Sequence, residues 1–314
     1  MKKILISGLL ICAATLFSAK SDSLTLEVKP TKLSVNYIPD ITYSQATSGF
    51  NPHKLELDLL KPEGKIKRPA VVFITGGGFI AAPKSNYLQQ RMQIAEAGYV
   101  VASIEYRRVP DGVFPQPLED IKSAIRYLRA NADELGIDKN KIAVMGESAG
   151  GYFSAMTAVT NGERKYDVGK YLNESSEVQA AIDIYGLSDL TKVGDDFSEE
   201  VQRQHDSPAA TEALMANGAI PFGGDGSTIK NSKKVNEVNP ITHISSKTPP
   251  FLLLHGDKDT LVSPSQTEIL HKALVAKGID STRYVVKNAA HGGNYWIQPE
   301  VMKVIIDFLN KNLK

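Results

Sequence analysis

Residues 146–150, Gly-Glu-Ser-Ala-Gly, join an apolar run at 141–145 to a small-residue segment at 151–156. This order predicts a strand, a sharp turn and a helix. Glycines two residues before and two residues after Ser148 let the backbone turn without a clash, which is the pattern of a nucleophile elbow. A serine at a helix start lies beside unpaired N–H groups, which favour the negative charge formed when a carbonyl is attacked. The alternative is a glycine-rich turn whose serine has no function, since short motifs give false positives.

Apolar runs and segments with helical periodicity alternate along most of the chain. Two alternating patterns, at residues 24–28 and 55–59, predict half-exposed antiparallel strands at a sheet edge. Buried strands are expected over residues 70–74, 100–104, 142–145, 180–185, 251–254 and 283–286, and helices over residues 87–97, 118–131, 266–277 and 300–313. This alternation predicts an α/β fold with a mostly parallel, doubly wound sheet and helices on both faces.

The first 21 residues predict a secretory signal peptide. A basic start, Lys2-Lys3, precedes an apolar run over residues 4–17 and a polar segment at 18–21, and the run is too short to predict a membrane span. We therefore expect a mature domain over residues 22–314 that is secreted or periplasmic and has no membrane partner after cleavage. The one cysteine, Cys12, lies inside the leader, so the mature chain is expected to have neither a disulfide nor a thiol nucleophile.

The composition is that of an ordinary globular protein, with 314 residues, a formal charge of +1 and 42% hydrophobic residues. Removal of the leader with Lys2, Lys3 and Lys20 would change the charge to −2. Neither value predicts a nucleic-acid partner. No two histidines have the spacing of a His-Glu-x-x-His metal site, so neither a metal nor another cofactor is expected. The sequence does not determine the oligomeric state.

Four motifs follow one another along the chain: Thr-Gly-Gly-Gly-Phe at 75–79, Glu-Tyr-Arg-Arg-Val-Pro at 105–110, the elbow at 146–150, and an acid-containing segment at 254–262 followed by a histidine segment at 289–293. In these motifs the chain resembles the α/β-hydrolase family, and within it the small secreted esterases and lipases that include acetyl and feruloyl esterases of plant polysaccharides. The resemblance covers residues 55–313 and implies the α/β-hydrolase fold. Arg107 and Arg108, in the second motif, are interpreted as structural.

The resemblance implies a catalytic triad of Ser148, Asp259 and His291, in the chain order of the family. Serine is a weak nucleophile at neutral pH, so His291 would take its proton during attack and return it to the leaving alcohol. Asp259 would hold the correct tautomer and stabilise the imidazolium. Asp257 is the alternative acid and is interpreted as a turn residue, as is His255.

The resemblance also implies an oxyanion hole formed by the backbone N–H groups of Gly77, Gly78 and Ala149. Glycines are needed in the first loop because the substrate oxygen approaches the main chain closely. Thr75 stands where the family usually has a histidine, and its hydroxyl could pin the loop. Glu147 is interpreted as a residue that orients nearby backbone groups, with a second general acid as the alternative.

Residues 188–248 connect two expected strands and are too long for a simple loop, so they predict a segment with a function or a structure of its own. In the family such an insertion covers the active site as a cap, and here it is expected to set the choice of substrate. Four aromatic residues near the motifs, Phe79, Tyr152, Tyr295 and Trp296, form either a platform for a feruloyl or sugar group or part of the ordinary core.

These inferences predict a secreted serine carboxylesterase that works through an acyl-enzyme and takes a small-molecule or polysaccharide-linked ester. The expected substrates are short-chain or aryl esters, among them acetyl or feruloyl groups on plant polysaccharides. The alternatives are a serine peptidase like prolyl oligopeptidase, a lipase, and a noncatalytic binding module on a hydrolase fold. Such peptidases usually carry a gating domain, for which about 290 residues leave no room. Binding modules typically lose a triad member, whereas all three candidates are present.

Overall fold

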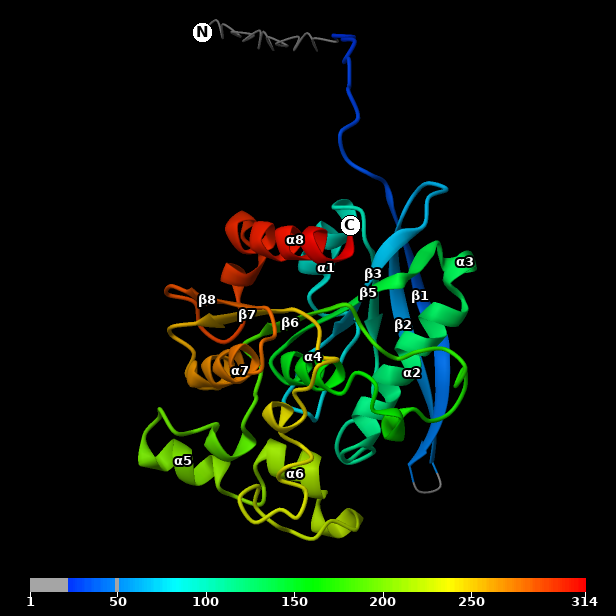
Figure 1. The fold of residues 1–314 in the computed structure, drawn as a ribbon. Helices are drawn as coiled ribbons and strands as arrows, with labels where there is room; N and C mark the ends of the chain where they lie inside the picture. The colour runs from blue at the N-terminus through cyan, green and yellow to red at the C-terminus, as the bar shows by residue number, and fades with distance from the viewer. Residues whose placement is uncertain (1–21, 49–50) are drawn as a thin grey trace, which may run out of the picture. The chain divides into compact units, whose positions relative to one another are not determined.

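The strands form one sheet in the order β1-β2-β4-β3-β5-β6-β7-β8 (Figure 1). The computed structural model describes residues 22–48 and 51–314, and the strand bounds are β1 (Val35–Ser48), β2 (Asn51–Pro62), β3 (Arg68–Ile74), β4 (Val100–Ile104), β5 (Ile137–Glu147), β6 (Ala180–Ile184), β7 (Phe251–Gly256) and β8 (Ser281–Val286). Strands β3 to β8 run parallel, while β1 and β2 form an antiparallel edge. The prediction of a mostly parallel sheet is confirmed.

The prediction of a strand at residues 24–28 is wrong. Residues 22–31 have no regular secondary structure, and the side chains of Leu24, Leu26 and Val28 are exposed. Alternation of apolar and polar residues produces a strand only where a neighbouring strand completes the hydrogen bonds, and this segment has no such partner among the described residues. The edge strand next to β2 is instead β1, which the sequence did not predict. The predicted leader over residues 1–21 lies outside the described residues, so cleavage and export stay predictions.

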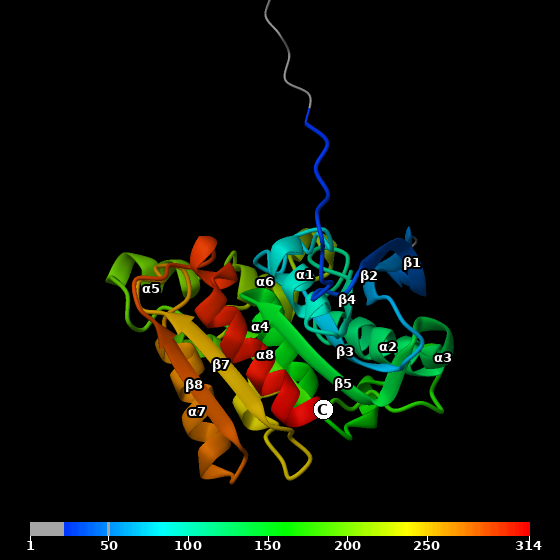
Figure 2. The same ribbon diagram turned by 90° about the horizontal axis from the view of Figure 1, so that it is seen from above.

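Helices cover both faces of the sheet, as predicted. Helices α1 (Leu88–Glu96) and α8 (Pro299–Leu313) lie on one face, and α2 (Gln116–Ala130), α4 (Ala149–Val159) and α7 (Ser265–Ala276) lie on the other (Figure 1). Figure 2 shows α8 lying over the middle of the sheet and running along the direction of β5 and β7. Successive strand residues point to opposite faces, so Val72 and Val144 join the cluster under α2 and α4, while Val71 and Met145 join the cluster under α8. The central strands are therefore buried on both faces.

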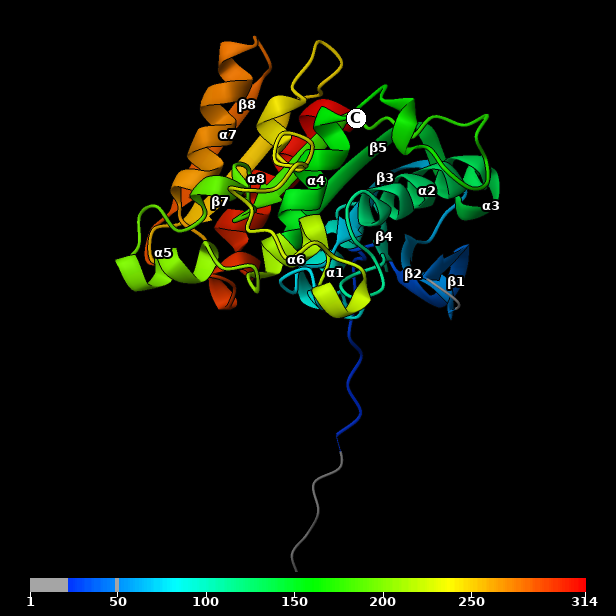
Figure 3. The same cartoon turned by 90° about the horizontal axis from the view of Figure 1, so that it is seen from below.

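The connection between β6 and β7 contains several short helices. They are η2 (Leu190–Lys192), α5 (Glu199–His205), α6 (Thr211–Asn217), η3 (Ile220–Phe222) and η4 (Pro240–Thr242); elsewhere the chain forms α3 (Ala132–Leu135), η1 (Arg164–Tyr166) and η5 (Asn294–Ile297). Helices α5 and α6 lie on the side of the sheet that carries α4 and α7 (Figure 1), and Figure 3 views them from that side. No helix in residues 22–48 and 51–314 combines the length and the apolarity needed to cross a membrane.

A buried ion pair attaches the end of β4 to α2. The side chain of Arg107 donates from Nε to Asp120 Oδ2 and from Nη2 to Asp120 Oδ1, both at 2.8 Å. The backbone N–H of Arg107 also donates to Asp120 Oδ2, at 2.9 Å. This bidentate ion pair fixes the chain just after β4 and supports the structural interpretation of Arg107.

We expect Arg107→Ala to lower the free energy of unfolding by about 3–5 kcal/mol, because it leaves the Asp120 carboxylate buried without its cation. Unfolding in urea measures this change. The matched control is Arg203→Ala, which removes an exposed ion pair with Glu199 on α5 and should change the free energy by less than about 0.5 kcal/mol. Equal stability of the two variants would contradict the prediction.

Candidate active site

Ser148 lies in the predicted sharp turn between β5 and α4. Its backbone has φ 57° and ψ −123°, a left-handed φ that is uncommon for a residue other than glycine. The N–H of Ser148 donates to the Ile184 carbonyl at 2.9 Å, so the neighbouring strand β6 holds the turn. Gly150 allows α4 to start this close to β3, since a Cβ there would lie 1.9 Å from the Ile74 carbonyl oxygen. The sequence therefore presents the serine on a turn that the sheet fixes.

A chain of hydrogen bonds joins Ser148 to Asp259 through His291. Nε2 of His291 lies 2.8 Å from Ser148 Oγ, although the two residues are 143 apart in the sequence. Nδ1 of His291 lies 2.7 Å from Asp259 Oδ2. The three residues follow β5, β7 and β8, and the carboxyl ends of parallel strands meet at one edge of the sheet. With a proton on Nδ1, the imidazole can accept the serine proton at Nε2.

Asp259 is buried and accepts four hydrogen bonds. Oδ1 accepts from the N–H groups of Leu261 and Val262 at 2.8 and 2.9 Å, and Oδ2 accepts from His291 and from Nε2 of His255, the latter at 3.1 Å. Burial by itself would raise the pKa of Asp259, but the bonds from His255, His291 and Val262 outweigh it and hold the pKa well below its usual value. The carboxylate is therefore ionised and oriented.

The interpretation of His255 as a turn residue is wrong. His255 belongs to β7, is fully buried, and shares Asp259 Oδ2 with His291. Its Nε2 also lies 3.1 Å from the Val262 carbonyl, so this nitrogen carries the proton. The alternative acid, Asp257, accepts instead from the N–H of Asn288, at 2.6 Å. The only sign of the role of His255 in the sequence is its position four residues before Asp259.

The loop after β3 lies against the Ser148 turn. A Cβ at Gly76 would lie 2.5 Å from the Glu147 carbonyl oxygen and 3.1 Å from Ser148 Cβ. The Gly77 carbonyl accepts from the N–H groups of Ile80 and Ala81, which folds the loop back on itself. In the part of the chain that the structure describes, the N–H groups of Gly77, Gly78 and Ala149 donate to no protein acceptor. These three N–H groups therefore have the capacity to donate to a ligand.

The loop is pinned through the backbone of Thr75 and not through its hydroxyl. The Thr75 carbonyl accepts from the Tyr106 hydroxyl at 2.9 Å, whereas Thr75 Oγ1 is buried without a hydrogen-bond partner among the described residues. The expectation that the hydroxyl pins the loop is therefore wrong. Tyr106 belongs to the second sequence motif, and its place beside Arg107 gave no indication of this contact with the loop.

A pocket of about 440 Å³ lies between the α5–α6 segment and the turn that carries Asp259. It is lined by Val201, Gln204, His205, Ser207, Ala209, Ala210, Thr211, Glu212, Thr260 and Leu261. Thr211 also lies beside the loop after β3, since a Cβ at Gly78 would be 3.9 Å from Thr211 Oγ1. Inside the pocket, His205 Nδ1 lies 2.6 Å from the buried carboxyl of Glu212, and this hydrogen bond raises the pKa of His205. The pocket therefore reaches the loop after β3 and the turn that carries Asp259, and it contains a hydrogen-bonded histidine and carboxyl.

A family model described as BD-FAE matches residues 57–274. The chain belongs to the BD-FAE family. The probable carboxylic ester hydrolase LipM of Mycobacterium tuberculosis (strain ATCC 25618 / H37Rv) is 29% identical over 63% of this chain and 43% of its own length. The chain spans about half the length of the curated relatives it matches. The resemblance to α/β-hydrolase esterases is thus confirmed at the level of the family.

Solved structures share the fold of this BD-FAE protein. A truncated form of a carbohydrate esterase from gut microbiota has a TM-score of 0.76 and 23% identity, with 89% of this chain and 96% of that chain covered. A Bacteroides eggerthii protein described as a bifunctional GH43-CE has a TM-score of 0.75 and 27% identity, with 88% of this chain and 35% of that chain covered. The prediction of an α/β-hydrolase fold is confirmed.

Most of the aromatic side chains near the motifs of this BD-FAE protein belong to the core. Phe79, Tyr152 and Trp296 are at most 2% exposed, and Phe79 packs edge-on against Tyr152. The structure therefore does not support a platform made of these three residues, while Tyr295 is 41% exposed.

Within the described residues, no group of three or more His, Cys, Asp or Glu side chains could hold a metal ion.

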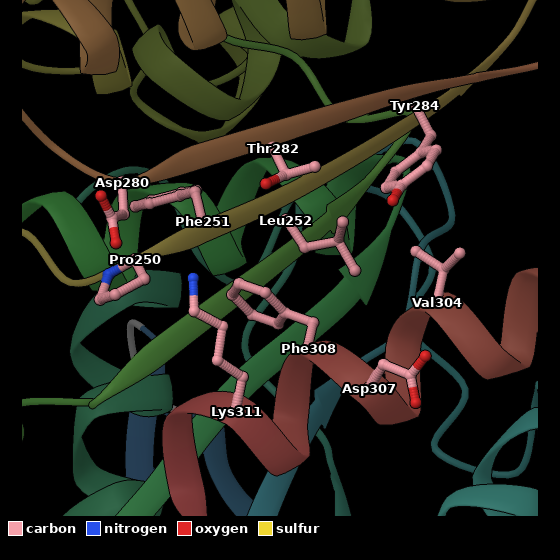
Figure 4. A pocket seen from close by; sticks show the side chains of 10 residues that line it. All are labelled: Pro250, Phe251, Leu252, Asp280, Thr282, Tyr284, Val304, Asp307, Phe308 and Lys311. Carbon is pink, nitrogen blue, oxygen red and sulfur yellow. The ribbon is translucent and has the colours of Figure 1, made fainter.

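A second pocket, of about 210 Å³, is not part of this site (Figure 4). Residues from the start of β7, the start of β8 and the last turns of α8 line it, among them Leu252, Thr282 and Phe308. Ser148, Asp259 and His291 instead follow the carboxyl ends of their strands. The two pockets therefore lie at opposite ends of the parallel strands.

The contact between Ser148 and His291 predicts a serine that reacts with organophosphates. Paraoxon should phosphorylate Ser148, with p-nitrophenolate leaving as His291 takes the serine proton, and the intact mass reports the adduct. We expect no adduct in Ser148→Ala and a rate at least about 100-fold lower in His291→Ala. The matched control is Ser154→Ala, which removes another buried serine from α4 and should react like the wild type. Modification of Ser148→Ala at the wild-type rate would contradict the prediction.

Proposed function

We propose that this protein is a serine carboxylic ester hydrolase with Ser148, His291 and Asp259 as its catalytic triad. The observation that carries the proposal is the unbroken hydrogen-bond chain from Ser148 Oγ through both imidazole nitrogens to a buried carboxylate. A left-handed turn presents the serine, and the N–H groups of Gly77, Gly78 and Ala149 have no protein acceptors in the described chain. The name of the relative LipM, a probable carboxylic ester hydrolase, supports an ester as the substrate.

The proposed reaction has two steps. In the first, Ser148 Oγ attacks the ester carbonyl carbon while His291 Nε2 takes the hydroxyl proton, and Asp259 stabilises the imidazolium. The N–H groups of Gly77, Gly78 and Ala149 bind the oxyanion until His291 gives its proton to the leaving alcohol. In the second, His291 takes a proton from water, whose oxygen attacks the acyl carbon, and the carboxylic acid leaves as Ser148 regains a proton.

The proposed substrates are short-chain or aryl esters, with acetyl or feruloyl groups on plant polysaccharides as the natural class. The pocket beside the site has a volume within the usual range of about 300–1,000 Å³ for small-molecule sites. Hydroxyls from Ser207, Thr211 and Thr260 line it together with the Glu212 carboxyl, and such groups can bind sugar hydroxyls. The segment over residues 188–248, which supplies most of this lining, would act as the cap that selects the substrate.

We expect the purified protein to hydrolyse p-nitrophenyl acetate and to lose this activity in Ser148→Ala. The same assay should compare methyl ferulate, acetylated xylan, a long-chain p-nitrophenyl ester and a prolyl anilide, in order to rank the substrate classes. Ser154→Ala controls for the removal of a serine hydroxyl. Cleavage of the anilide without any ester would replace the esterase by the peptidase alternative, and absence of all turnover would favour the binding module.

We expect Ala210→Phe to narrow the pocket and to lower kcat/KM for methyl ferulate or acetylated xylan by about tenfold or more. The kcat/KM for p-nitrophenyl acetate should stay unchanged. Acetyl and p-nitrophenyl groups place less volume beside the serine than a feruloyl group or a xylan chain. Ile220→Phe is the matched control, since Ile220 is exposed in the same segment and does not line the pocket. Unchanged kcat/KM for both bulky substrates would contradict the role given to this pocket.

A further inference from the structure

The carboxyl of Glu147 is buried directly before the candidate nucleophile, and the reaction proposed above gives it no role. Glu147 ends β5, pairs in register with Ile184 of β6, and is 1% exposed. Its Oε2 accepts a hydrogen bond from the Tyr185 hydroxyl, while its Oε1 has no partner in the described chain. The side chain of Gln90, from α1, lies beside the carboxyl, and Gln90 Oε1 also lacks a partner there.

Tyr185 connects this carboxyl to the candidate base. Its ring centroid lies 4.6 Å from that of the His291 imidazole, with an angle of 53° between the planes. The ring of Trp296 packs against the same tyrosine, also at 4.6 Å between centroids. The backbone of Tyr185 has φ 43°, which is strained for a bulky residue, and its N–H donates to the Leu254 carbonyl at 2.7 Å. Four contacts therefore fix Tyr185 in a conformation that it would not adopt by itself.

The surroundings of the Glu147 carboxyl favour its neutral form. Burial raises its pKa to about 8, against the opposing effect of the Tyr185 hydroxyl and of the nearby Gln90 side chain. The titratable groups that face it are Tyr185, after β6, and Tyr87, before α1; burial and the charge of Glu147 raise the pKa of both phenols. No cation in residues 22–48 and 51–314 lowers the pKa of Glu147. Loss of its proton would therefore leave an uncompensated charge among apolar side chains.

We propose that Tyr185 and Glu147 are positioning residues for His291: neutral Glu147 anchors the tyrosine hydroxyl, and the tyrosine ring holds the imidazole so that Nε2 stays aimed at Ser148. The face of the ring also favours the imidazolium that forms during attack. Ionisation of Glu147 strengthens its hydrogen bond with Tyr185 but leaves a buried charge without a cation, which favours arrangements that admit water around the carboxyl and shift the tyrosine ring. The inference rests on the esterase function proposed above and adds to it a structural reason for loss of activity at alkaline pH.

The test measures kcat and KM for ethyl acetate between pH 6 and 10 by pH-stat titration of the released acid. We expect the wild-type kcat to fall as the pH rises through 8, and that of Glu147→Gln to stay level, because the amide keeps the acceptor for Tyr185 and cannot ionise. Tyr185→Phe keeps the ring but loses its anchor, and should lower kcat by about tenfold with KM within about twofold.

Two control variants separate this role from general effects of burial. Asp183→Asn removes another buried acid of raised pKa, from β6, and should keep the wild-type alkaline loss. Tyr99→Phe removes a buried tyrosine hydroxyl that donates to Asn310 at 2.7 Å, and should keep the wild-type kcat. The proposal is overturned if Glu147→Gln retains the alkaline loss, or if Tyr185→Phe has the kcat of the wild type.

A failure of the proposed esterase function would be distinguishable from a failure of this inference, because the wild type itself would then hydrolyse no ester. The rate of paraoxon phosphorylation of Ser148 would replace turnover as the readout for the same variants.

Unfolding in urea tests the protonation of Glu147 by a second measurement, the free energy of unfolding as a function of pH. Native Glu147 keeps its proton between pH 4.5 and about 8, where the unfolded carboxyl has lost it, so the wild type loses stability relative to Glu147→Gln as the pH rises through this range. If the difference in stability between the wild type and Glu147→Gln is constant from pH 5 to 8, the assignment of Glu147 as a neutral acid is overturned.

Discussion

Ser148 has a left-handed backbone conformation between a strand and a helix, and the elements around it are arranged so that this conformation is stable. Such a residue costs about 1–3 kcal/mol and persists only where its neighbours fix it. The Ile184 carbonyl of β6 binds its N–H, and Gly150 lets the first turn of α4 pass against the Ile74 carbonyl of β3. Three adjacent strands must therefore be in register before the serine is presented to a ligand.

Asp259 contacts the candidate base directly and Glu147 is linked to it through Tyr185, and the surroundings of these two buried carboxyls give them opposite properties. Asp259 accepts four hydrogen bonds, two of them from imidazoles, so its charged form is favoured despite burial. Glu147 has a tyrosine hydroxyl and an amide beside it, so burial dominates and the neutral form is favoured. The number and the charge of the donors decide this difference, since both groups are carboxylic acids. His291 thus lies between a charged hydrogen-bond acceptor and a tyrosine that a neutral acid anchors.

Local patterns predicted the parts of this protein that depend on neighbours in the chain. The predicted helices correspond to α1, α2, α7 and α8, because their periodicity is a property of consecutive residues. The strand predicted at residues 24–28 failed because alternation does not reveal whether a partner strand exists, and β1 was missed for the same reason. Ser148, Asp259 and His291 were chosen from motif order, and the structure brings these three side chains together.

The class of fold, the glycines that allow the Ser148 turn and the residue types of the candidate triad could all be predicted from the amino-acid sequence. The tertiary structure alone decided that Tyr106 holds the Thr75 carbonyl, that His255 shares the carboxylate of Asp259, and that Tyr185 links Glu147 to His291. Turns and periodicity are encoded within a few residues, so they can be read from the chain. Contacts such as that of Tyr185 with Glu147, 38 residues apart, depend on the order of strands in the sheet and on which face each side chain occupies.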